Sequence, residues 1–315
     1  MTGPSPAERL VDLLNLEEID LNIFRGRSPQ ESLQRVFGGQ VAGQALVAAG
    51  RTVAEQRPVH SLHAYFLRPG IPGVPIVYQV ERVRDGRSFT TRRVVAVQQG
   101  RTIFNLTASF HVQEPGFEHQ LPMPRVPEPE SLPQLADEIR ERLGSLPEPL
   151  ERMARRQAFD LRYVDRLRWS PSELEGVEPR SAVWMRAIGS LGDDPLVHTC
   201  ALTYASDMTL LDAVRLPVEP LWGPRNFDTA SLDHAMWFHR PFRADEWFLY
   251  QQESPIATGA RGLARGQIFD REGRLIVSVM QEGLFRSHSP ERNASPAQQA
   301  QGTGSQQTQG QTSAS

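Results

Sequence analysis

The chain has 315 residues, of which 39% are hydrophobic and 23% are charged, and its formal net charge is −3. This composition is typical of a folded, enzyme-like protein with one large domain or two ordinary ones, and it excludes a largely disordered chain. The near-balance of acidic and basic residues gives no electrostatic reason to expect a nucleic-acid partner.

Along the first half, the sequence predicts one enclosed helix followed by antiparallel strands. An early strand is expected at Ile19–Arg25, and Val41–Val53 is apolar on nearly every side, which is typical of a helix buried by other elements. The strand after this helix ends at Arg68-Pro69. Three further segments alternate apolar and polar residues as half-buried antiparallel strands do, and they are Ile76–Val83, Thr90–Gln98 and Ile103–Val112.

A proline-rich stretch then separates two halves of similar length. Residues 115–158 form a predicted linker, because proline fixes φ and removes a backbone donor, although a short helix is expected within it at Leu132–Leu143. Residues 287–315 contain no large apolar residue and are predicted to be a disordered tail. The two halves are therefore residues 9–114 and 159–286.

The second half repeats the order of elements in the first. An early strand at Ala182–Ile188 and a helix at Thr199–Val214 precede a strand that ends at Arg240-Pro241, 172 residues after the first Arg-Pro pair. Three strand-like segments follow, and they are Trp247–Glu253, Ala260–Phe269 and Leu275–Phe285. One helix enclosed by a curved antiparallel sheet is the α+β unit of the hotdog fold. We therefore expect a tandem, or double, hotdog fold with antiparallel sheets wrapped around two central helices.

Two residue counts limit the chemistry. All 34 lysine and arginine residues are arginine, which excludes a P-loop and a Schiff-base mechanism. The single cysteine, Cys200, excludes an internal disulfide and a thiolate zinc cluster, and it fits a reducing compartment. Because no segment approaches the roughly 20 apolar residues of a membrane span and the first residues lack a signal-peptide pattern, we expect a cytoplasmic protein.

Four motifs, in this order and spacing, resemble the acyl-CoA thioesterase II family. They are FGGQVAGQA from Phe37, YASD ending at Asp207, DHAMWFH from Asp233 and QEG from Gln281. The resemblance covers the chain from about Arg9 to Arg286. It implies a double-hotdog hydrolase that cleaves fatty acyl-CoA to a free fatty acid and coenzyme A, with no metal or other cofactor.

The resemblance also implies the residues that hold the attacking water. In this family an Asp at the start of the second central helix, a Thr or Ser before the Asp-His motif and a Gln near the last strand have this role. These positions correspond to Asp207, Ser231 and Gln281. The carboxylate can accept a proton from water, while the hydroxyl and the amide offer donors and acceptors that orient it. Without the resemblance, Asp207 would be an ordinary helix-capping acid and the other two plain polar residues of strands.

Further groups are expected near this site. The backbone N–H groups of Gly38, Gly39 and Gln40, at the approach to the first central helix, could hold the developing oxyanion. The two glycines would equally permit close helix packing. The resemblance implies that His234 lies beside the site, where packing or support of the site is expected rather than proton transfer. We expect no metal, because no carboxylate or third histidine lies at ligand spacing beside either histidine pair, His60 with His63 or His234 with His239.

The repeat predicts that only one half is catalytic. Aligned through the repeat, Asp207 falls opposite Gly43 or Ala42, and Gln281 falls opposite Ala108. None of these counterparts carries a carboxylate or an amide. We therefore expect one water-activating site per chain, with the first half supplying the acyl channel and donors. We also expect a homodimer or homotetramer, because association would bury further sheet surface.

Two other functions remain open from the sequence. A hotdog enoyl-thioester hydratase or dehydratase would need a positioned histidine and acid on one helix, and the segment Met208–Asp212 after Asp207 contains no histidine. A non-catalytic acyl-CoA-binding protein would need no water-activating residues, so only a measurement of activity separates it from the hydrolase.

Overall fold

A computed structural model describes residues 3–29, 34–54, 56–146, 151, 157–165, 168–220 and 226–288. Within these residues, the helices of the first half are α1 (Pro6–Leu14) and α2 (Gly38–Gly50). The strands of the first half are β1 (Glu17–Asp20), β2 (Ile23–Gly26), β3 (Val59–Phe66), β4 (Ile76–Asp85), β5 (Phe89–Gln98) and β6 (Arg101–His111).

The connecting region and the second half contain the remaining elements. The connecting region includes a 3-10 turn, η1 (Pro129–Ser131), and a helix, α3 (Leu135–Leu143). The strands of the second half are β7 (Phe159–Tyr163), β8 (Arg180–Ala187), β9 (Phe227–Ser231), β10 (Asp233–Phe238), β11 (Phe248–Thr258), β12 (Arg261–Asp270) and β13 (Leu275–Ser287). Its helical segments are η2 (Pro171–Leu174), α5 (Pro195–Ser206) and α6 (Asp212–Arg215).

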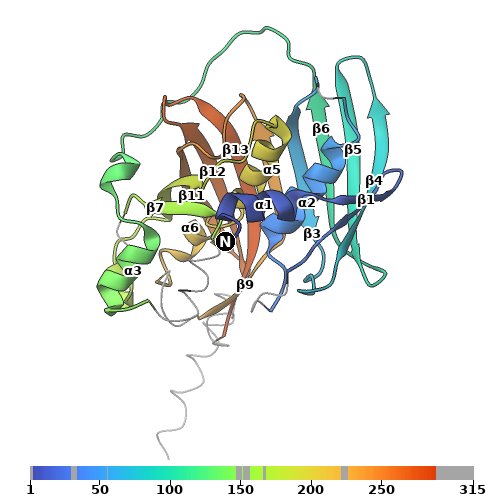
Figure 1. Ribbon diagram of the computed structural model, residues 1–315. Helices are drawn as coiled ribbons and strands as arrows, with labels where there is room; N and C mark the ends of the chain where they lie inside the picture. The colour runs from blue at the N-terminus through green and yellow to red at the C-terminus, as the bar shows by residue number, and fades with distance from the viewer. Residues whose placement is uncertain are drawn as a thin grey trace, which may run out of the picture.

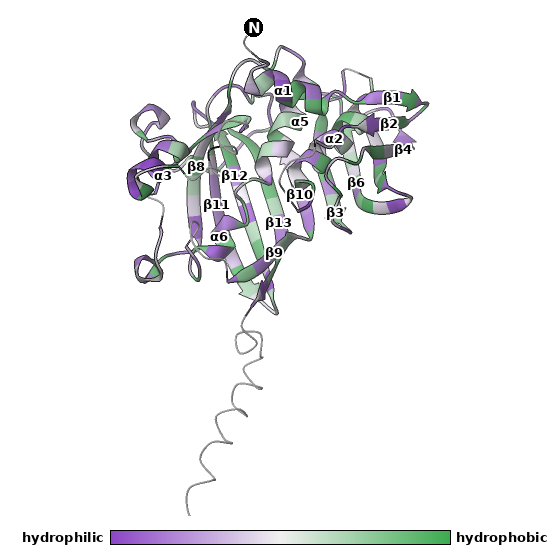
Figure 2. Cartoon of the chain, turned by 60° about the horizontal axis from the view of Figure 1, so that its bottom comes forward, coloured by the Kyte–Doolittle hydropathy of each residue, from purple (hydrophilic) through white to green (hydrophobic). Residues whose placement is uncertain are grey.

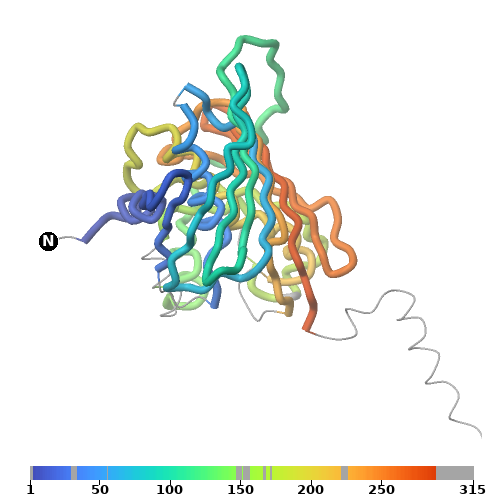
Figure 3. Tube along the Cα trace, turned by 90° about the vertical axis from the view of Figure 1, so that its right-hand side faces the viewer, coloured from blue at the N-terminus to red at the C-terminus, as the bar shows by residue number. Residues whose placement is uncertain are grey.

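The described strands form one antiparallel sheet of thirteen strands (Figure 1). Twelve lie in the order β1-β2-β4-β5-β6-β3-β10-β13-β12-β11-β8-β7, and β9 pairs with β13 beside this path. The two halves join where β3 pairs with β10, so that Leu62 lies opposite Met236. Seen from the side, the strands of the first half continue into those of the second as one curved layer (Figure 3). The tandem hotdog prediction is confirmed, with the two sheets joined edge to edge.

The concave side of the sheet encloses α2 and α5, which pack against each other. Every residue of α2 from Gly39 to Ala49 is buried, including Gln40 and Gln44, as expected for a helix whose other residues are all glycine or apolar. The strands alternate hydrophilic and hydrophobic residues along their length (Figure 2), and in β5 the buried positions recur at every second residue. This period of two directs one face of each strand toward the helices and the other toward solvent.

Three element boundaries differ from the sequence prediction. Helix α2 begins at Gly38, three residues before the predicted start. The second central helix, predicted over Thr199–Val214, ends at Ser206, and only the short α6 follows it. Apolar residues on both sides of this break are buried, so hydrophobicity gave no sign of it. The strand predicted at Ile19–Arg25 is a β1–β2 hairpin that turns at Asn22, whose φ is 60°.

The connecting region and the chain end were only partly predicted. The short helix expected at Leu132–Leu143 is α3, which begins at Leu135. Strand β13 continues through Ser287, the first residue of the predicted tail. Residues 147–150 and 152–156 of the linker and residues 289–315 of the tail lie outside the described residues, so the proposed domain boundaries stay predictions. In the described parts of the chain, no helix is long and apolar enough to cross a membrane.

Candidate active site

Asp207 lies where the end of α5 meets the start of α2. It is the C-terminal cap of α5, with φ −87° and ψ −2°, and its backbone N–H donates to the carbonyl of Ala205. The expectation that Asp207 begins a helix is therefore wrong. Because the C-terminal end of a helix carries partial negative charge, this position alone would disfavour a carboxylate. The nearby N-terminal end of α2 carries partial positive charge and offsets that effect.

Two strands of the second half bring donors to the Asp207 carboxylate. Gln281 Nε2, from β13, donates to Asp207 Oδ1 at 2.6 Å. Ser231 Oγ, from the end of β9, donates to the same oxygen at 3.1 Å. Ser231 and Asp207 are half-buried, whereas Gln281 is fully buried. The pairing of β9 with β13 sets Ser231 opposite Gly283, two residues beyond Gln281. The structure thus brings together all three residues that the sequence proposed.

Gly38 closes the other side of the carboxylate. A Cβ placed on Gly38 would lie 2.6 Å from Asp207 Oδ2 and 2.8 Å from a ring carbon of Phe66, so any side chain there would displace one of them. Gly38 is also the first residue of α2, whose cap residue Phe37 makes no side-chain capping bond. Because the first N–H groups of a helix have no acceptor within the helix, they can bind an anion beside Asp207.

The neighbours of Gly38 face elsewhere. A Cβ on Gly39 would overlap the carbonyl oxygen of Tyr204 in α5, so this glycine permits the close approach of the two central helices. The side-chain amide of Gln40 donates to the carbonyl of Arg27 at 3.0 Å, away from the carboxylate. Any contribution of these two residues to an oxyanion site would come from their backbone N–H groups, and that role stays a prediction.

His234 lies directly behind the site. Its side chain, on β10, is 1% exposed, and its Nε2 lies 2.8 Å from Ser206 Oγ. Burial lowers the pKa of the His234 imidazole, while the charge of Asp207 and a hydrogen bond with Gln281 act in the opposite direction. A buried neutral imidazole is suited to holding neighbouring groups rather than to carrying charge. This arrangement fits the expected supporting role.

A cavity of about 690 Å³ opens onto Gly38, Asp207 and Ser231. Most of its wall is apolar and comes from both halves of the chain. The larger apolar residues are Val36, Phe37, Val41, Phe66, Leu67, Ile103, Phe104, Met208, Leu211, Leu232 and Phe285, and Pro69 and Ala230 lie among them. Arg35 and Arg68, both exposed, also line it. The sequence indicated no binding role for either arginine, since Arg68 stood out only as part of the repeated Arg-Pro pair and Arg35 lies in no motif.

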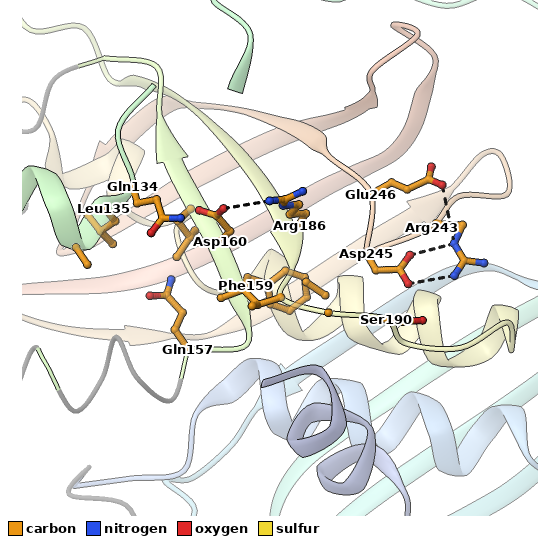
Figure 4. Close-up of a pocket in the computed structure, with 15 residues that line it drawn as sticks. Gln134, Leu135, Gln157, Phe159, Asp160, Arg186, Ser190, Arg243, Asp245 and Glu246 are labelled. Atoms are coloured by element: carbon orange, nitrogen blue, oxygen red, sulfur yellow. Dashed lines mark hydrogen bonds and ion pairs between the residues drawn. The ribbon is translucent and has the colours of Figure 1, made fainter. Parts of the chain in front are cut away.

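A second cavity, of about 700 Å³, lies between α3 and the β7 edge of the sheet. It contains none of the proposed site residues. Its charged groups pair with one another: Arg186 lies 3.8 Å from Asp160, and Arg243 lies 3.0 Å from Asp245 (Figure 4). Because these charges are already compensated, we place the candidate active site in the cavity at Asp207.

Among its described residues, the first half has no equivalent of the Asp207 carboxylate at its central helix. Tyr78 and Tyr250 are 172 residues apart, and each reaches a central helix. The hydroxyl of Tyr250 donates to the carbonyl of Ser206, next to Asp207. That of Tyr78 donates to the side chain of Gln44, whose amide in turn donates to backbone carbonyls. Gln44 is thus held by its own neighbours, which supports the prediction of one water-activating site per chain. Among the described residues, no group of three His, Cys, Asp or Glu could hold a metal ion.

Comparisons with known proteins show the family to which this chain belongs. Residues 153–284 match the family Acyl-CoA thioesterase, and residues 27–111 match the Acyl-CoA thioesterase N-terminal domain. The chain is 44% identical over 284 residues to human acyl-coenzyme A thioesterase 8, covering 87% of this chain and 88% of the relative. It is 41% identical over 280 residues to acyl-CoA thioesterase 2 of Haemophilus influenzae, covering 88% and 96%. The solved structure of an acyl-CoA thioesterase II from Mycobacterium marinum has a TM-score of 0.74 at 44% identity, covering 90% of this chain and 98% of that one.

Proposed function

Because the chain belongs to the acyl-CoA thioesterase family, it hydrolyses the thioester bond of acyl-CoA, and we propose that Asp207, Ser231 and Gln281 hold the attacking water. The observation that carries this proposal is the convergence of two donors on Asp207 Oδ1. Both lone-pair directions of this oxygen are occupied by fixed partners, so the second oxygen, Oδ2, is the one that faces an incoming water beside Gly38.

The reaction that we propose is a direct attack by water on the thioester carbonyl carbon. Asp207 accepts a proton as the water oxygen forms a bond to this carbon, and the carbonyl oxygen becomes an oxyanion. The carbon–sulfur bond then breaks, and the proton passes to the departing thiolate. One water is consumed, and one carboxylic acid and one coenzyme A thiol are formed.

The first half of the chain contributes the oxyanion site and part of the acyl channel in this proposal. The N-terminal N–H groups of α2, beginning at Gly38, stabilise the oxyanion because they are fixed donors at the positive end of a helix. The apolar cavity wall, which includes Phe66 and Phe104, receives a fatty acyl chain. Arg35 and Arg68 face the phosphates of coenzyme A, since guanidinium groups pair well with phosphate.

Asp207→Asn tests the central assignment. The variant keeps the size of the side chain but removes the base, so we expect kcat to fall about 10²- to 10⁴-fold. The assay is thiol release from palmitoyl-CoA and octanoyl-CoA. Asp194→Asn is a matched control, because Asp194 caps the opposite end of the same helix and Asn is an equally good N-cap. A folded Asp207→Asn protein with the kcat of the control would refute the assignment.

The location and the oligomeric state of the protein are part of this proposal. We propose that it is cytoplasmic and that it forms a homodimer or homotetramer. Sedimentation velocity tests the oligomeric state, and a stable monomer would contradict it. The enoyl-thioester hydratase alternative is not favoured, because relatives above 40% identity over most of the chain are thioesterases. The same relatives disfavour a protein that only binds acyl-CoA. Hydration of crotonyl-CoA, measured beside thiol release, separates these possibilities directly.

A further inference from the structure

We propose that His234 is a positioning residue that fixes which way the side-chain amide of Gln281 faces, and so keeps the amide N–H directed at Asp207. The inference rests on the proposed function for the role of Asp207 and Gln281. It adds a reason why a buried histidine lies behind a water-activating carboxylate and takes no part in binding the water itself.

The sheet register brings His234 and Gln281 to the same place on neighbouring strands. Strands β10 and β13 are antiparallel and their last registered pair is Ala235 with Met280, so His234 and Gln281 are the next residues beyond that pair on the two strands. Directly opposed residues of adjacent strands have Cβ atoms about 4.5–5.5 Å apart. Both side chains point toward the central helices and are fully buried, with exposed fractions of 1% and 0%.

Each of these two side chains has one buried polar atom with no hydrogen-bond partner among the described residues. These atoms are His234 Nδ1 and Gln281 Oε1. Burial lowers the pKa of the His234 imidazole, and its interaction with the Gln281 side chain acts in the opposite direction. Leaving both atoms unpaired would be costly, and pairing them removes both penalties.

The Asp207 carboxylate determines the direction of this hydrogen bond. Gln281 Nε2 donates to Asp207 Oδ1, so Gln281 Oε1 must face away from the carboxylate, toward His234. An oxygen in that position can only accept, and the neutral imidazole must therefore carry its proton on Nδ1. His234 Nε2 then accepts from the Ser206 hydroxyl, 2.8 Å away. In this series of hydrogen bonds, from Ser206 through His234 and Gln281, every donor points in the direction of Asp207.

The effect on catalysis follows from the change in charge of Asp207 during turnover. While Asp207 is ionised, it repels Gln281 Oε1 and attracts the amide N–H. Once Asp207 has accepted a proton from water, it can itself donate, and its preference for the amide N–H disappears. The Nδ1–H of His234 continues to require an acceptor, so Gln281 stays in the orientation that the next turnover needs.

The first half of the chain shows that the fold does not require this polar pair. The positions 172 and 173 residues earlier are Leu62 and Ala108, which lie directly opposite each other, on β3 and β6. Both are fully buried. The half that lacks the catalytic acid therefore fills the same place with apolar side chains, and the half that carries Asp207 has a histidine and a glutamine there.

Kinetic measurements on two variants test the proposal. His234→Leu introduces the residue found at the counterpart position, and we expect kcat to fall about 10- to 100-fold with little change in KM, because a misplaced catalytic group costs rate rather than binding. His234→Asn keeps a short amide whose N–H can take the place of Nδ1–H, and its kcat should stay within about fivefold of wild type. Equal losses in the two folded variants, or no loss in His234→Leu, would overturn the proposal.

A second measurement does not depend on turnover. Nitrogen-15 NMR of histidine-labelled protein distinguishes the two neutral tautomers, and His234 should carry its proton on Nδ1 in the wild type. In Gln281→Leu the acceptor is gone. The Ser206 hydroxyl can then donate to the carbonyl of Thr203, 2.9 Å away, and accept from Nε2–H, so the tautomer should change.

The same Nε2–H tautomer in both proteins would overturn the proposal even if the kinetic variants did not fold. The tautomer measured by NMR also tests this proposal independently of the proposed function. An active Asp207→Asn enzyme would remove the role of Asp207, whereas the tautomer reports only on the contact between His234 and Gln281.

Discussion

A methyl group added at Gly38 should lower kcat by about 10²-fold while leaving the enzyme folded. In Gly38→Ala the new Cβ would lie 2.6 Å from Asp207 Oδ2 and 2.8 Å from the ring of Phe66. Since carbon and oxygen atoms in ordinary contact lie about 3.5 Å apart, the carboxylate must move by about 1 Å. Such a shift breaks or lengthens its bonds to Gln281, at 2.6 Å, and to Ser231, at 3.1 Å.

The expected loss can be separated into activity and stability. A misplacement of about 1 Å in a catalytic group can cost about 10²-fold in rate, so kcat should fall by roughly that factor. The displaced oxygen is the end of a flexible side chain, and alanine is favoured over glycine in a helix by about 0.5–1 kcal/mol. The free energy of unfolding should therefore change by no more than about 1 kcal/mol.

Gly39→Ala is the matched control for this experiment. Its Cβ would overlap the backbone carbonyl of Tyr204, which cannot move without separating the two central helices. We expect its free energy of unfolding to fall by about 1–3 kcal/mol, as for other overpacked positions. Thiol release and urea unfolding, measured on both variants, give the comparison. Wild-type kcat in Gly38→Ala would show that the carboxylate does not act from its observed position.

Three further predictions extend these expectations. Ser231→Ala removes a donor to Asp207 and should lower kcat by about tenfold, whereas Ser231→Thr keeps the hydroxyl and should stay near wild type; the reverse order would exclude the hydroxyl from the site. Arg68→Gln should raise the KM for acyl-CoA by up to about tenfold with kcat unchanged, and the effect should shrink at high salt, since a screened phosphate contact is lost. Burial lowers the pKa of the His234 imidazole in the folded protein. Below about pH 6.5, the unfolded protein therefore protonates this imidazole more readily than the folded protein does, and the free energy of unfolding decreases as the pH falls. Urea unfolding at pH 7.5 and 5.5 should therefore show a smaller pH-dependent loss in His234→Leu than in wild type; equal losses would contradict it.

The sequence predicted best the elements in which a single pattern of burial continues along the whole length. Helix α2 is enclosed along all but its ends, and β5 is buried on alternate residues, so hydrophobicity alone indicated both. The end of α5 at Ser206 was missed because the buried residues continue into the following turn and α6. Strand β9 was also missed, since its five residues are mostly half-exposed and show no alternation.

The site was predicted only in part, for a similar reason. Asp207, Ser231 and Gln281 were identified through motifs, and the position of Asp207 on its helix was predicted wrongly. No local pattern could show that Gly38, from the other half of the chain, lies against the carboxylate. That contact depends on how the two central helices pack, which no single segment determines.

By itself, the sequence determined the repeated helix-and-sheet unit, because hydrophobic period and the spacing of the Arg-Pro pairs are local properties of the chain. It also determined which chemical groups were present, with arginine as the only strong cation and Asp207 without a counterpart in the first half. Only the tertiary structure decided where these groups meet. The pairing of β3 with β10 sets the two halves side by side, and the registers of β9 and β10 on β13 bring Ser231 and His234 to either side of Gln281. Sheet register and helix packing depend on contacts between residues far apart in the chain. The arrangement in which Asp207 Oδ1 accepts hydrogen bonds from two donors therefore forms only when the protein folds.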